Sequence, residues 1–280
     1  MKKLIATFML LGVISISSHV QAQQSSTKAT WLWNTATITD EQTLQFLLEK
    51  EVTTVYLQID PSLPSEQYVE FISKMQAAHI EVQALDGMPE WDTTYFDAFW
   101  EWLSQYQQAY PESAFTAVHL DVEPYLSAFW QENEPMAIYQ YQELLHYAKE
   151  QANSMGLRLE ADIPFWYDEV FYKNTFGQGN LAEWVIKHID GVSIMAYRNT
   201  AYALKRVTAN EMAYAEKYET PVVMGVETMP FPEEPAISFS AKGEKRMNRL
   251  LQQMADHYAH NHYFDGVAVH HVQSWMTLKR

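Results

Sequence analysis

The chain contains no cysteine among its 280 residues. This absence excludes a disulfide scaffold, a thiolate metal site, a cysteine nucleophile and a lipid-modified N-terminal cysteine. Positive charge is also scarce, because 19 Lys and Arg residues face 35 Asp and Glu residues, which gives a formal net charge of −16. A surface of that sign repels phosphate backbones and anionic lipids, so we expect no nucleic-acid partner.

Long hydrophobic runs are missing as well. The apolar run at 4–17 is shorter than the roughly 20 residues that a membrane-spanning helix needs, so we expect no membrane span. Lys2 and Lys3 precede this run, and the small-residue cleavage pattern Val20-Gln21-Ala22 follows it. The pattern predicts a Sec-type export signal over 1–22, a single domain over 23–280, and a periplasmic or extracellular location.

Several sequence motifs of catalysis and cofactor binding are absent. The chain has no glycine-rich dinucleotide or phosphate loop, no G-x-S-x-G and no H-E-x-x-H. His270 and His271 are adjacent, so on a strand they face opposite ways and cannot both bind one metal ion. We therefore expect neither a cofactor nor a metal.

Alternating strand and helix patterns fill the remaining chain. Eight short apolar runs rich in β-branched or aromatic residues lie at 30–34, 53–60, 81–87, 117–125, 157–166, 191–198, 221–228 and 266–275. Helical periodicity separates them, which favours parallel pairing through right-handed crossovers. The simplest solution is a single α/β domain, a closed (β/α)8 barrel. Because only five residues follow Trp275, we expect the last helix to be short or missing.

Polar residues gather where these predicted strands end. In a barrel of this class, chemistry takes place at the carboxyl ends of the strands. Burying so many unpaired carboxylates would cost several kcal/mol, so their convergence indicates a site. The residues are Asn34, Asp60, Asp86, Asp121, Glu123, Asp162, Trp166, Tyr197, Arg198, Glu227, His270, His271 and Trp275.

The segment 118–125 carries the strongest local pattern. His119, Asp121 and Glu123 alternate with apolar residues, so on a strand they share the face that points into the barrel. Two acids this close disfavour double ionisation, which raises one pKa as a general acid requires. Glu227 ends another predicted strand, and two carboxylates that face each other across a pocket suit glycoside hydrolysis.

These motifs resemble those of chitinase-type family 18 glycoside hydrolases. Asp121 and Glu123 are similar to the end of that family's D-x-x-D-x-D-x-E signature, and Met195 with Tyr197 is similar to its Met-x-Tyr element. The resemblance implies that Glu123 is the acid, that Asp121 is its partner, and that Tyr197 helps to hold the substrate's acetamido group. It also implies that Trp275 stacks on sugar.

The chain departs from that family at several positions. Thr116, Ala117 and His119 stand where that family has further aspartates, and Arg198 replaces the usual Asp after the Tyr. We interpret the chain as an outlying family of barrel glycosidases.

A second resemblance is to the clan A retaining glycosidases. Glu123-Pro124 resembles the clan's Asn-Glu-Pro, with Val122 in place of the Asn. This likeness implies an acid/base at Glu123 and a nucleophile at Glu227. Both relatives therefore imply Glu123, whereas the second role stays open between Glu227 and a substrate-assisted route that Asp121 supports.

Aromatic residues make up 14% of the chain, which suits stacking on pyranose rings. We predict that substrate is bound by Trp33, Trp166 and Trp275 together with Asp86, Asp162, Arg198 and His270. The predicted function is an exported glycosidase of a polysaccharide or oligosaccharide. A non-catalytic barrel that binds glycans or a cell surface is the alternative, and a cell-wall amidase or deacetylase is a third interpretation. The sequence leaves the sugar, the linkage and the oligomeric state open.

Overall fold

The computed structural model describes residues 26–89 and 93–280, and for 93–95 it describes only the backbone. The predicted export signal at 1–22 lies outside the described residues. No helix in the described residues has both the length and the apolar character that crossing a membrane requires.

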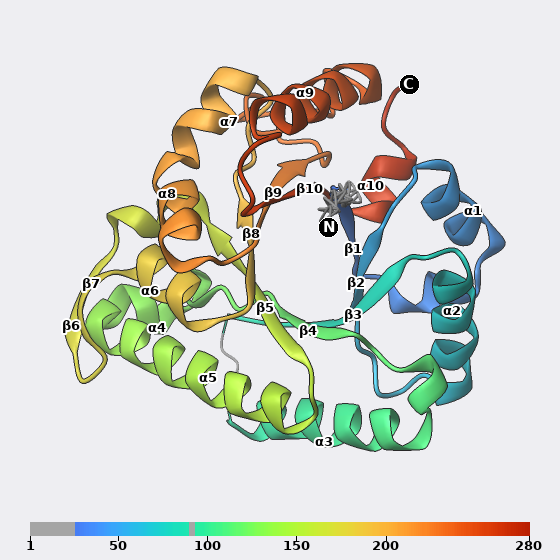
Figure 1. Ribbon diagram of the computed structural model, residues 1–280, viewed down its shortest axis with the longest axis horizontal. Coiled ribbons are helices and arrows are strands. Elements are labelled where there is room, and N and C mark those ends of the chain that lie inside the picture. Colours follow the sequence, from blue (N-terminus) through green and yellow to red (C-terminus); the bar gives the residue numbers. More distant parts are fainter. Residues whose placement is uncertain (1–25, 90–92) are drawn as a thin grey trace, which may run out of the picture.

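Eight parallel strands close into a barrel in the order β1-β10-β9-β8-β5-β4-β3-β2 (Figure 1). Their bounds are β1 Thr27–Leu32, β2 Thr54–Gln58, β3 Glu81–Asp86, β4 Ala117–Leu120, β5 Arg158–Pro164, β8 Gly191–Met195, β9 Val222–Glu227 and β10 Phe264–His270. Around the barrel, each strand pairs with the barrel strands that come before and after it in the chain, and β10 closes the barrel on β1. Right-handed β-α-β crossovers produce this order. The predicted (β/α)8 barrel is confirmed.

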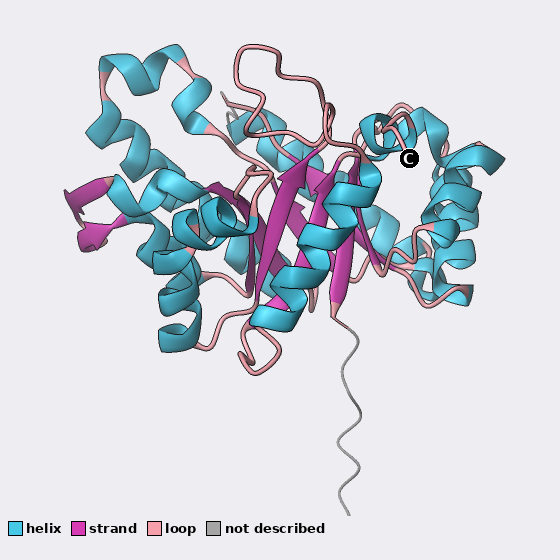
Figure 2. Cartoon of the chain, turned by 90° about the horizontal axis from the view of Figure 1, so that it is seen from above, coloured by secondary structure: helices cyan, strands magenta, loops and turns pink. Residues whose placement is uncertain are grey.

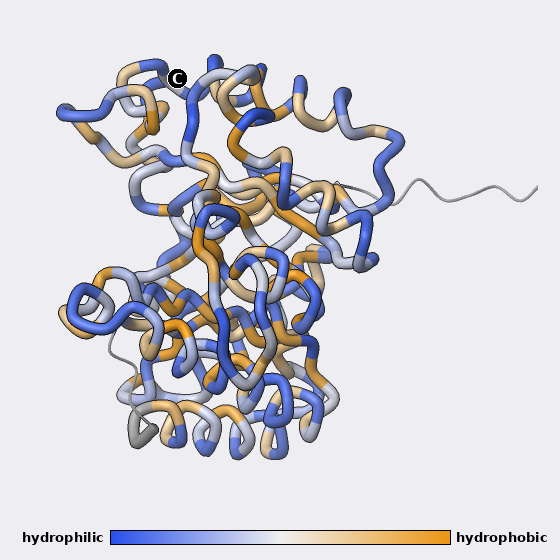
Figure 3. The backbone as a smooth tube through the Cα atoms, turned by 90° about the vertical axis from the view of Figure 1, so that its left-hand side faces the viewer, coloured by the Kyte–Doolittle hydropathy of each residue, from blue (hydrophilic) through white to orange (hydrophobic). Residues whose placement is uncertain are grey.

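Helices form the outer layer (Figures 1 and 2). Their bounds are α1 Glu41–Glu49, α2 Ser65–Ala77, α3 Thr93–Ala109, α4 Ala128–Glu132, α5 Glu134–Ser154, α6 Leu181–His188, α7 Ala201–Val207, α8 Ala209–Tyr218, α9 Glu244–His257 and α10 Val272–Met276. Apolar residues on the outer face of each strand pack against these helices in one continuous core. In Figure 3 the hydrophobic stretches accordingly concentrate toward the middle of the molecule.

The inside of the barrel has a different composition. Alternate residues of each strand point inward, and they form a small separate apolar cluster that includes Trp31, Tyr56 and Leu85. His119 and Asp162 lie in the same interior, with His119 fully buried and Asp162 only 2% exposed. Charged groups are therefore enclosed by the barrel wall directly below its carboxyl end, where strand ends place the candidate site.

Two features depart from a plain barrel. The chain after β10 forms only the five-residue α10, which confirms that the last helix is short. A small antiparallel hairpin, β6 (Phe171–Asn174) with β7 (Gly177–Asn180), stands between β5 and α6 and projects from one side in Figure 2. We had not predicted this hairpin. The 3₁₀ turns η1 Thr35–Thr39, η2 Pro111–Ser113, η3 Pro124–Leu126 and η4 Phe165–Glu169 complete the connections.

Candidate active site at the carboxyl ends of the strands

The site is built around the end of β4. Asp121 continues the pairing with β3, because its backbone N–H donates to the Asp86 carbonyl at 3.0 Å. The two chains approach so closely that a Cβ on Gly87 would lie 2.0 Å from the Asp121 carbonyl oxygen, so glycine is required there. Glu123 then caps η3, which turns the chain outward at Pro124. The two acids are thus held by backbone contacts at the mouth of the barrel.

The carboxyl groups of Asp121 and Glu123 are stabilised in their protonated forms. Burial, with a smaller contribution from the charge of Asp162, raises the pKa of Glu123 to about 7, and His270 opposes this rise. Burial, together with Asp162 and Glu123, raises the pKa of Asp121 well above its usual range. Asp121 Oδ1 is buried and has no hydrogen-bond partner among the described residues, whereas Glu123 accepts a hydrogen bond from the Tyr125 hydroxyl. A carboxyl that titrates near neutral pH can donate a proton at physiological pH.

Asp162, on β5, lies beneath these two acids. Trp31 Nε1 donates to its Oδ2 at 2.8 Å, and His119 Nε2 lies 3.0 Å from its Oδ1. The side chain of Asp162 has no solvent exposure. The predicted contact of Asp162 with substrate stays a prediction, whereas in this structure its carboxylate faces the enclosed barrel interior and acts on the site through its charge.

Tyr197 follows β8 and lies among the acids. Burial raises the pKa of its hydroxyl well above the usual range, and the charges of Glu227, Asp121 and Asp162 add to the rise. Its neighbour on β9 is Gly225, where a Cβ would lie 3.4 Å from Trp31 and 3.6 Å from the Tyr197 ring. The absent side chain leaves room for both aromatic rings. Tyr197 therefore stays protonated and can donate a hydrogen bond to a ligand.

Arg198 turns away from the acids that surround Tyr197. Its guanidinium group lies 4.5 Å from the centre of the Phe165 ring and donates to the Tyr197 carbonyl at 2.8 Å. The side chain is half-buried at the rim of the barrel mouth. Its role in binding substrate stays a prediction.

Glu227 has a different environment from Glu123. Its Oε1 accepts backbone hydrogen bonds from Thr228 and Met229 at 2.6 and 2.7 Å, and its Oε2 lies 2.8 Å from His270 Nδ1. The residue is only 2% exposed. His270 in turn accepts at Nε2 from Trp33 Nε1, 3.1 Å away. Glu227 thus fixes the tautomer and the orientation of His270, and His270 holds the indole of Trp33.

The remaining predicted binding residues lie at the rim. Trp166, in η4, is half-buried and packs edge-on against Tyr125 with ring centres 4.9 Å apart. Asp86 is 5% exposed and accepts hydrogen bonds from Gln58 Nε2 and the Gly87 N–H. Burial raises the pKa of Asp86. Trp166 therefore lies close to Glu123, because Tyr125 contacts both residues, whereas Asp86 forms part of the wall of the site.

Trp275 does not belong to the site, and our prediction for it is wrong. It is 1% exposed, its Nε1 donates to Glu244 Oε1 at 2.9 Å, and its ring packs edge-on against Phe46. The reason is that β10 ends at His270 and the chain then turns into α10. This turn carries Trp275 into the helix layer, away from the mouth of the barrel.

Sequence reasoning missed two contributors. Trp31 holds Asp162 from inside the barrel, and the Tyr125 hydroxyl contacts Glu123. Trp31 could have been found, because on β1 it shares the inward face with Trp33 two residues on. Tyr125 could not, since its position depends on the turn η3.

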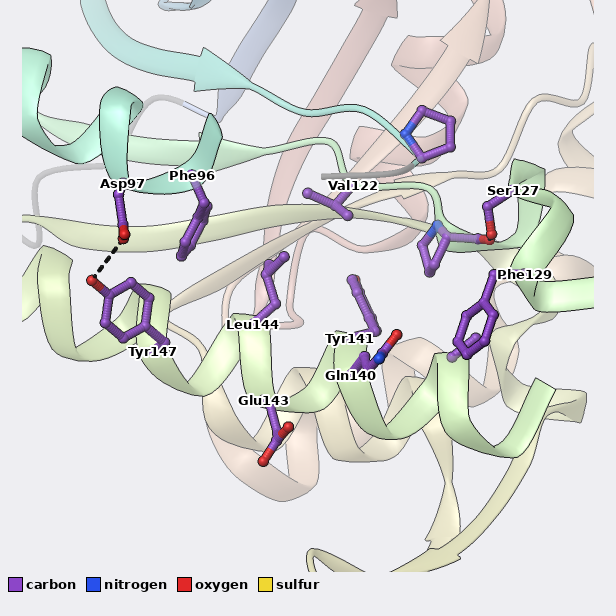
Figure 4. A pocket seen from close by; sticks show the side chains of 13 residues that line it. Phe96, Asp97, Val122, Ser127, Phe129, Gln140, Tyr141, Glu143, Leu144 and Tyr147 are labelled. Carbon is purple, nitrogen blue, oxygen red and sulfur yellow. Dashed lines mark hydrogen bonds between the residues drawn. The ribbon is translucent and has the colours of Figure 1, made fainter. Parts of the chain in front are cut away.

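A groove of about 810 Å³ lies outside the barrel wall, between α3 and α5 (Figure 4). Val122 and Pro124 contribute to it, but Glu123, which stands between them in the chain, does not. The groove therefore lies behind the segment that carries the acids. In residues 26–89 and 93–280, no three His, Asp or Glu side chains are grouped so that they could hold a metal ion.

Comparison with known proteins gives fold relatives only. No family model matches the chain, and no curated protein matches it in sequence. Among solved structures, it is similar to the spore cortex-lytic enzyme SleL of Bacillus megaterium QM B1551, with a TM-score of 0.55, 12% identity, and coverage of 90% of this chain and 73% of that one. It is also similar to a family GH18 chitinase from Pseudoalteromonas aurantia, with a TM-score of 0.51, 11% identity, and coverage of 88% of this chain and 94% of that one. For Dispersin B the TM-score is 0.51 and the identity 9%, with coverage of 91% of this chain and 94% of that one. At these identities the likeness shows the barrel fold and leaves the chemistry to the residues.

Proposed function

We propose that the protein is a glycoside hydrolase in which Glu123 is the general acid. The observation that carries this proposal is the position of Glu123 at the end of β4 with a pKa raised to about 7. Such a group is protonated in a large fraction of molecules near neutral pH and can protonate the leaving oxygen of a glycosidic bond. The names of the fold relatives, which include chitinases and a cortex-lytic enzyme, support the same class of reaction.

The second role falls to Asp121 rather than to Glu227. Glu227 is only 2% exposed, and its carboxyl group is bound to two backbone N–H groups and to His270, so it is poorly placed to reach an anomeric carbon. Asp121 has a buried oxygen without a partner, next to Glu123. In the proposed reaction, Asp121 accepts a hydrogen bond from the N–H of a 2-acetamido group, and Tyr197 donates one to that group.

The acetamido oxygen is then the nucleophile. It forms a bond to the anomeric carbon as the glycosidic C–O bond breaks, and the leaving oxygen takes the proton of Glu123. The Glu123 carboxylate next removes a proton from water, which attacks the anomeric carbon and restores the acetamido group. Atoms and charge balance, and the anomeric configuration is retained over the two steps.

The proposed substrate is an oligomer or polymer that contains 2-acetamido sugars. Trp33 and Trp166, both half-buried at the mouth, offer aromatic faces to sugar rings. The leader pattern at 1–22 supports a proposed periplasmic or extracellular site of action. The surplus of acidic residues favours a neutral or cationic polymer over an anionic one.

The test is a reducing-end assay of the exported protein on a panel of polysaccharides with and without acetamido groups, with the variant Glu123→Gln as control. We expect release of reducing ends only from acetamido-containing polymers, and loss of that release in the variant. Saturable binding of an oligosaccharide without turnover would instead identify the protein as a glycan-binding barrel. Turnover that Glu123→Gln leaves unchanged would exclude Glu123 as the acid.

A further inference from the structure

His119 is a fully buried histidine in the middle of the barrel. Its ring stacks on Tyr56 with centres 3.7 Å apart, and the edge of Trp31 closes another side. Its two nitrogens point at polar groups on the neighbouring strands, with Nδ1 at 3.2 Å from Gln83 Oε1 on β3 and Nε2 at 3.0 Å from Asp162 Oδ1 on β5. The protonation of this ring therefore depends on what those two partners can accept or donate.

Both partners are acceptors. The Gln83 amide is oriented by its Nε2, which donates to Glu81 Oε1 at 3.2 Å and leaves its carbonyl oxygen facing His119. Asp162 offers a carboxylate oxygen. A neutral imidazole carries one N–H only, so it would leave a nitrogen lone pair facing an acceptor inside the barrel. An imidazolium, with a proton on each nitrogen, satisfies both contacts.

The contact between His119 and Asp162 also fits a pair of charges. Nε2 and Oδ1 lie 3.0 Å apart, yet neither atom makes a well-directed hydrogen bond within the described residues. Electrostatic attraction tolerates such a misaligned N–H, whereas two neutral buried groups would be left unsatisfied. The other oxygen of Asp162 accepts from Trp31 Nε1 and needs no proton of its own.

Other charges around the ring are paired elsewhere. Below His119, Arg158 pairs with Glu81 at 2.5 Å and with Glu160 at 3.1 Å. Burial raises the pKa of Glu160, and the charge of His119 opposes that rise. Asp162 is the carboxylate whose oxygen lies 3.0 Å from a ring nitrogen of His119. The titratable groups that face the same interior from above are Asp121, Glu123, Tyr197, Glu227 and His270.

We propose that His119 is an imidazolium in a buried ion pair with Asp162, and that this pair keeps the negative charge of the site on Asp162 and the protons on Asp121 and Glu123. His119 is then a positioning residue, because it acts through Asp162 and touches no substrate. The inference rests on the proposed function for its consequence in catalysis. The charge state of His119 itself does not depend on that function.

The arrangement explains the departure of this chain from the chitinase-type signature. His119 stands where that signature has an aspartate, and Asp162 supplies the carboxyl group from the next strand. A cation and an anion thus lie below the acids, where the signature has a further acid on the same strand.

The direct test is nitrogen-15 NMR of histidine-labelled protein at about pH 8, well above the ordinary imidazole pKa of about 6.5. The His119 signals are assigned by their loss in His119→Gln. We expect both ring nitrogens to be protonated in the wild-type protein, and one to lose its proton in Asp162→Asn. Glu160→Gln is the matched control, because it removes a carboxylate from the same strand but leaves His119 charged. A neutral His119 in the wild-type protein would overturn the proposal whether or not the protein is an enzyme.

The kinetic consequence is a second readout. Asp162→Asn removes the carboxylate that raises the pKa of Glu123, and the loss of the His119 proton partly offsets this change, so the alkaline limb of kcat/KM should move down by less than about one pH unit. An unmoved limb, together with a charged His119, would overturn the link to Glu123 and leave the ion pair intact. A protein that shows the charged His119 but no turnover on any glycan would fail the proposed function alone.

Discussion

Two edges of the barrel mouth carry carboxyl groups of the same kind in opposite environments. At the β4–β5 edge, Asp121 has a buried oxygen without a partner, and the pKa of Glu123 is raised to about 7. At the β9–β10 edge, both oxygens of Glu227 accept hydrogen bonds, from two backbone N–H groups and from His270. The first edge holds carboxyl groups whose pKa values are raised, whereas the carboxyl group of the second edge is held by hydrogen bonds that orient its neighbours.

The difference comes from the supply of donors. Two backbone N–H groups and the imidazole of His270 donate to Glu227. The carboxyl groups at the other edge face the charge of Asp162, and within residues 26–89 and 93–280 the Tyr125 hydroxyl is the one group that donates a hydrogen bond to Glu123. The two glutamates therefore differ in the number of groups that donate to them.

The largest expected effect is that of Glu123→Gln. The amide keeps the size of the side chain and its contact with Tyr125 but has no proton to transfer, so we expect kcat to fall by about 10²- to 10⁴-fold. The measurement is reducing-end release under saturating substrate, with circular dichroism to confirm that the fold is intact. Loss of less than about tenfold would mean that the β4–β5 edge does not supply the acid.

The pH profile of the wild-type protein tests the same edge. Glu123 must be protonated to act as an acid, and its pKa of about 7 means that rising pH removes the proton in that range. We expect kcat/KM to fall about tenfold per pH unit above about pH 7. In Glu123→Gln any residual activity should lack this limb, and a limb that persists there belongs to another group.

Most of the fold, and the β4 edge, follow from local patterns in the sequence. Strand and helix periodicities alternate along the chain. Because successive side chains of a strand point to opposite faces, Asp121 and Glu123, two residues apart, lie on the same face. The hairpin β6–β7 escaped prediction because its strands are short and largely polar or glycine-containing, and because Phe171 is 72% exposed. Such strands lack the run of alternating apolar residues that predicts a strand.

The division between the two edges could not be predicted. Glu123 and Glu227 both end strands, and what separates them is the backbone beyond β9 and a histidine from β10. Trp275 failed for a related reason, since the point where β10 stops decides which side of the barrel wall the indole takes. Such contacts join residues distant in the chain, and only the folded barrel brings them together.

Glu227→Gln should have a smaller effect than Glu123→Gln. The amide oxygen still accepts from the backbone, but its N–H₂ group faces the proton on His270 Nδ1, so His270 and the Trp33 indole lose their orientation. We expect kcat/KM to fall by about tenfold, mainly through KM, and stability to fall by about 1–3 kcal/mol. Steady-state kinetics and urea unfolding measure both.

The outcome for Glu227 decides whether the two edges differ as described. A loss in kcat as large as that of Glu123→Gln would make Glu227 the nucleophile, as in the clan A resemblance. Trp33→Phe is the matched comparison, because it removes the same indole contact while leaving Glu227 intact. Equal KM effects in the two variants would support a positioning role for Glu227.

The smallest expected effect on activity is that of Glu211→Gln, in α8. Burial raises the pKa of Glu211 to about 8, with a small contribution from Asp168, and both its carboxylate oxygens lack hydrogen-bond partners among the described residues. A raised pKa is therefore not confined to the barrel mouth. Because none of the site acids contributes to the shift of Glu211, we expect kcat/KM of the variant to stay within about twofold of the wild-type value.

Stability is where Glu211 should show its effect. The folded protein holds this proton up to about pH 8, whereas the unfolded chain releases it near the ordinary pKa of about 4.3. The unfolded state therefore binds fewer protons between these values, and the free energy of unfolding falls as pH rises through this window. Glu211→Gln should flatten that fall in urea unfolding, while Glu123→Gln removes the limb in kcat/KM. If Glu211→Gln also abolished turnover, position at the strand ends would no longer separate a catalytic acid from a structural one.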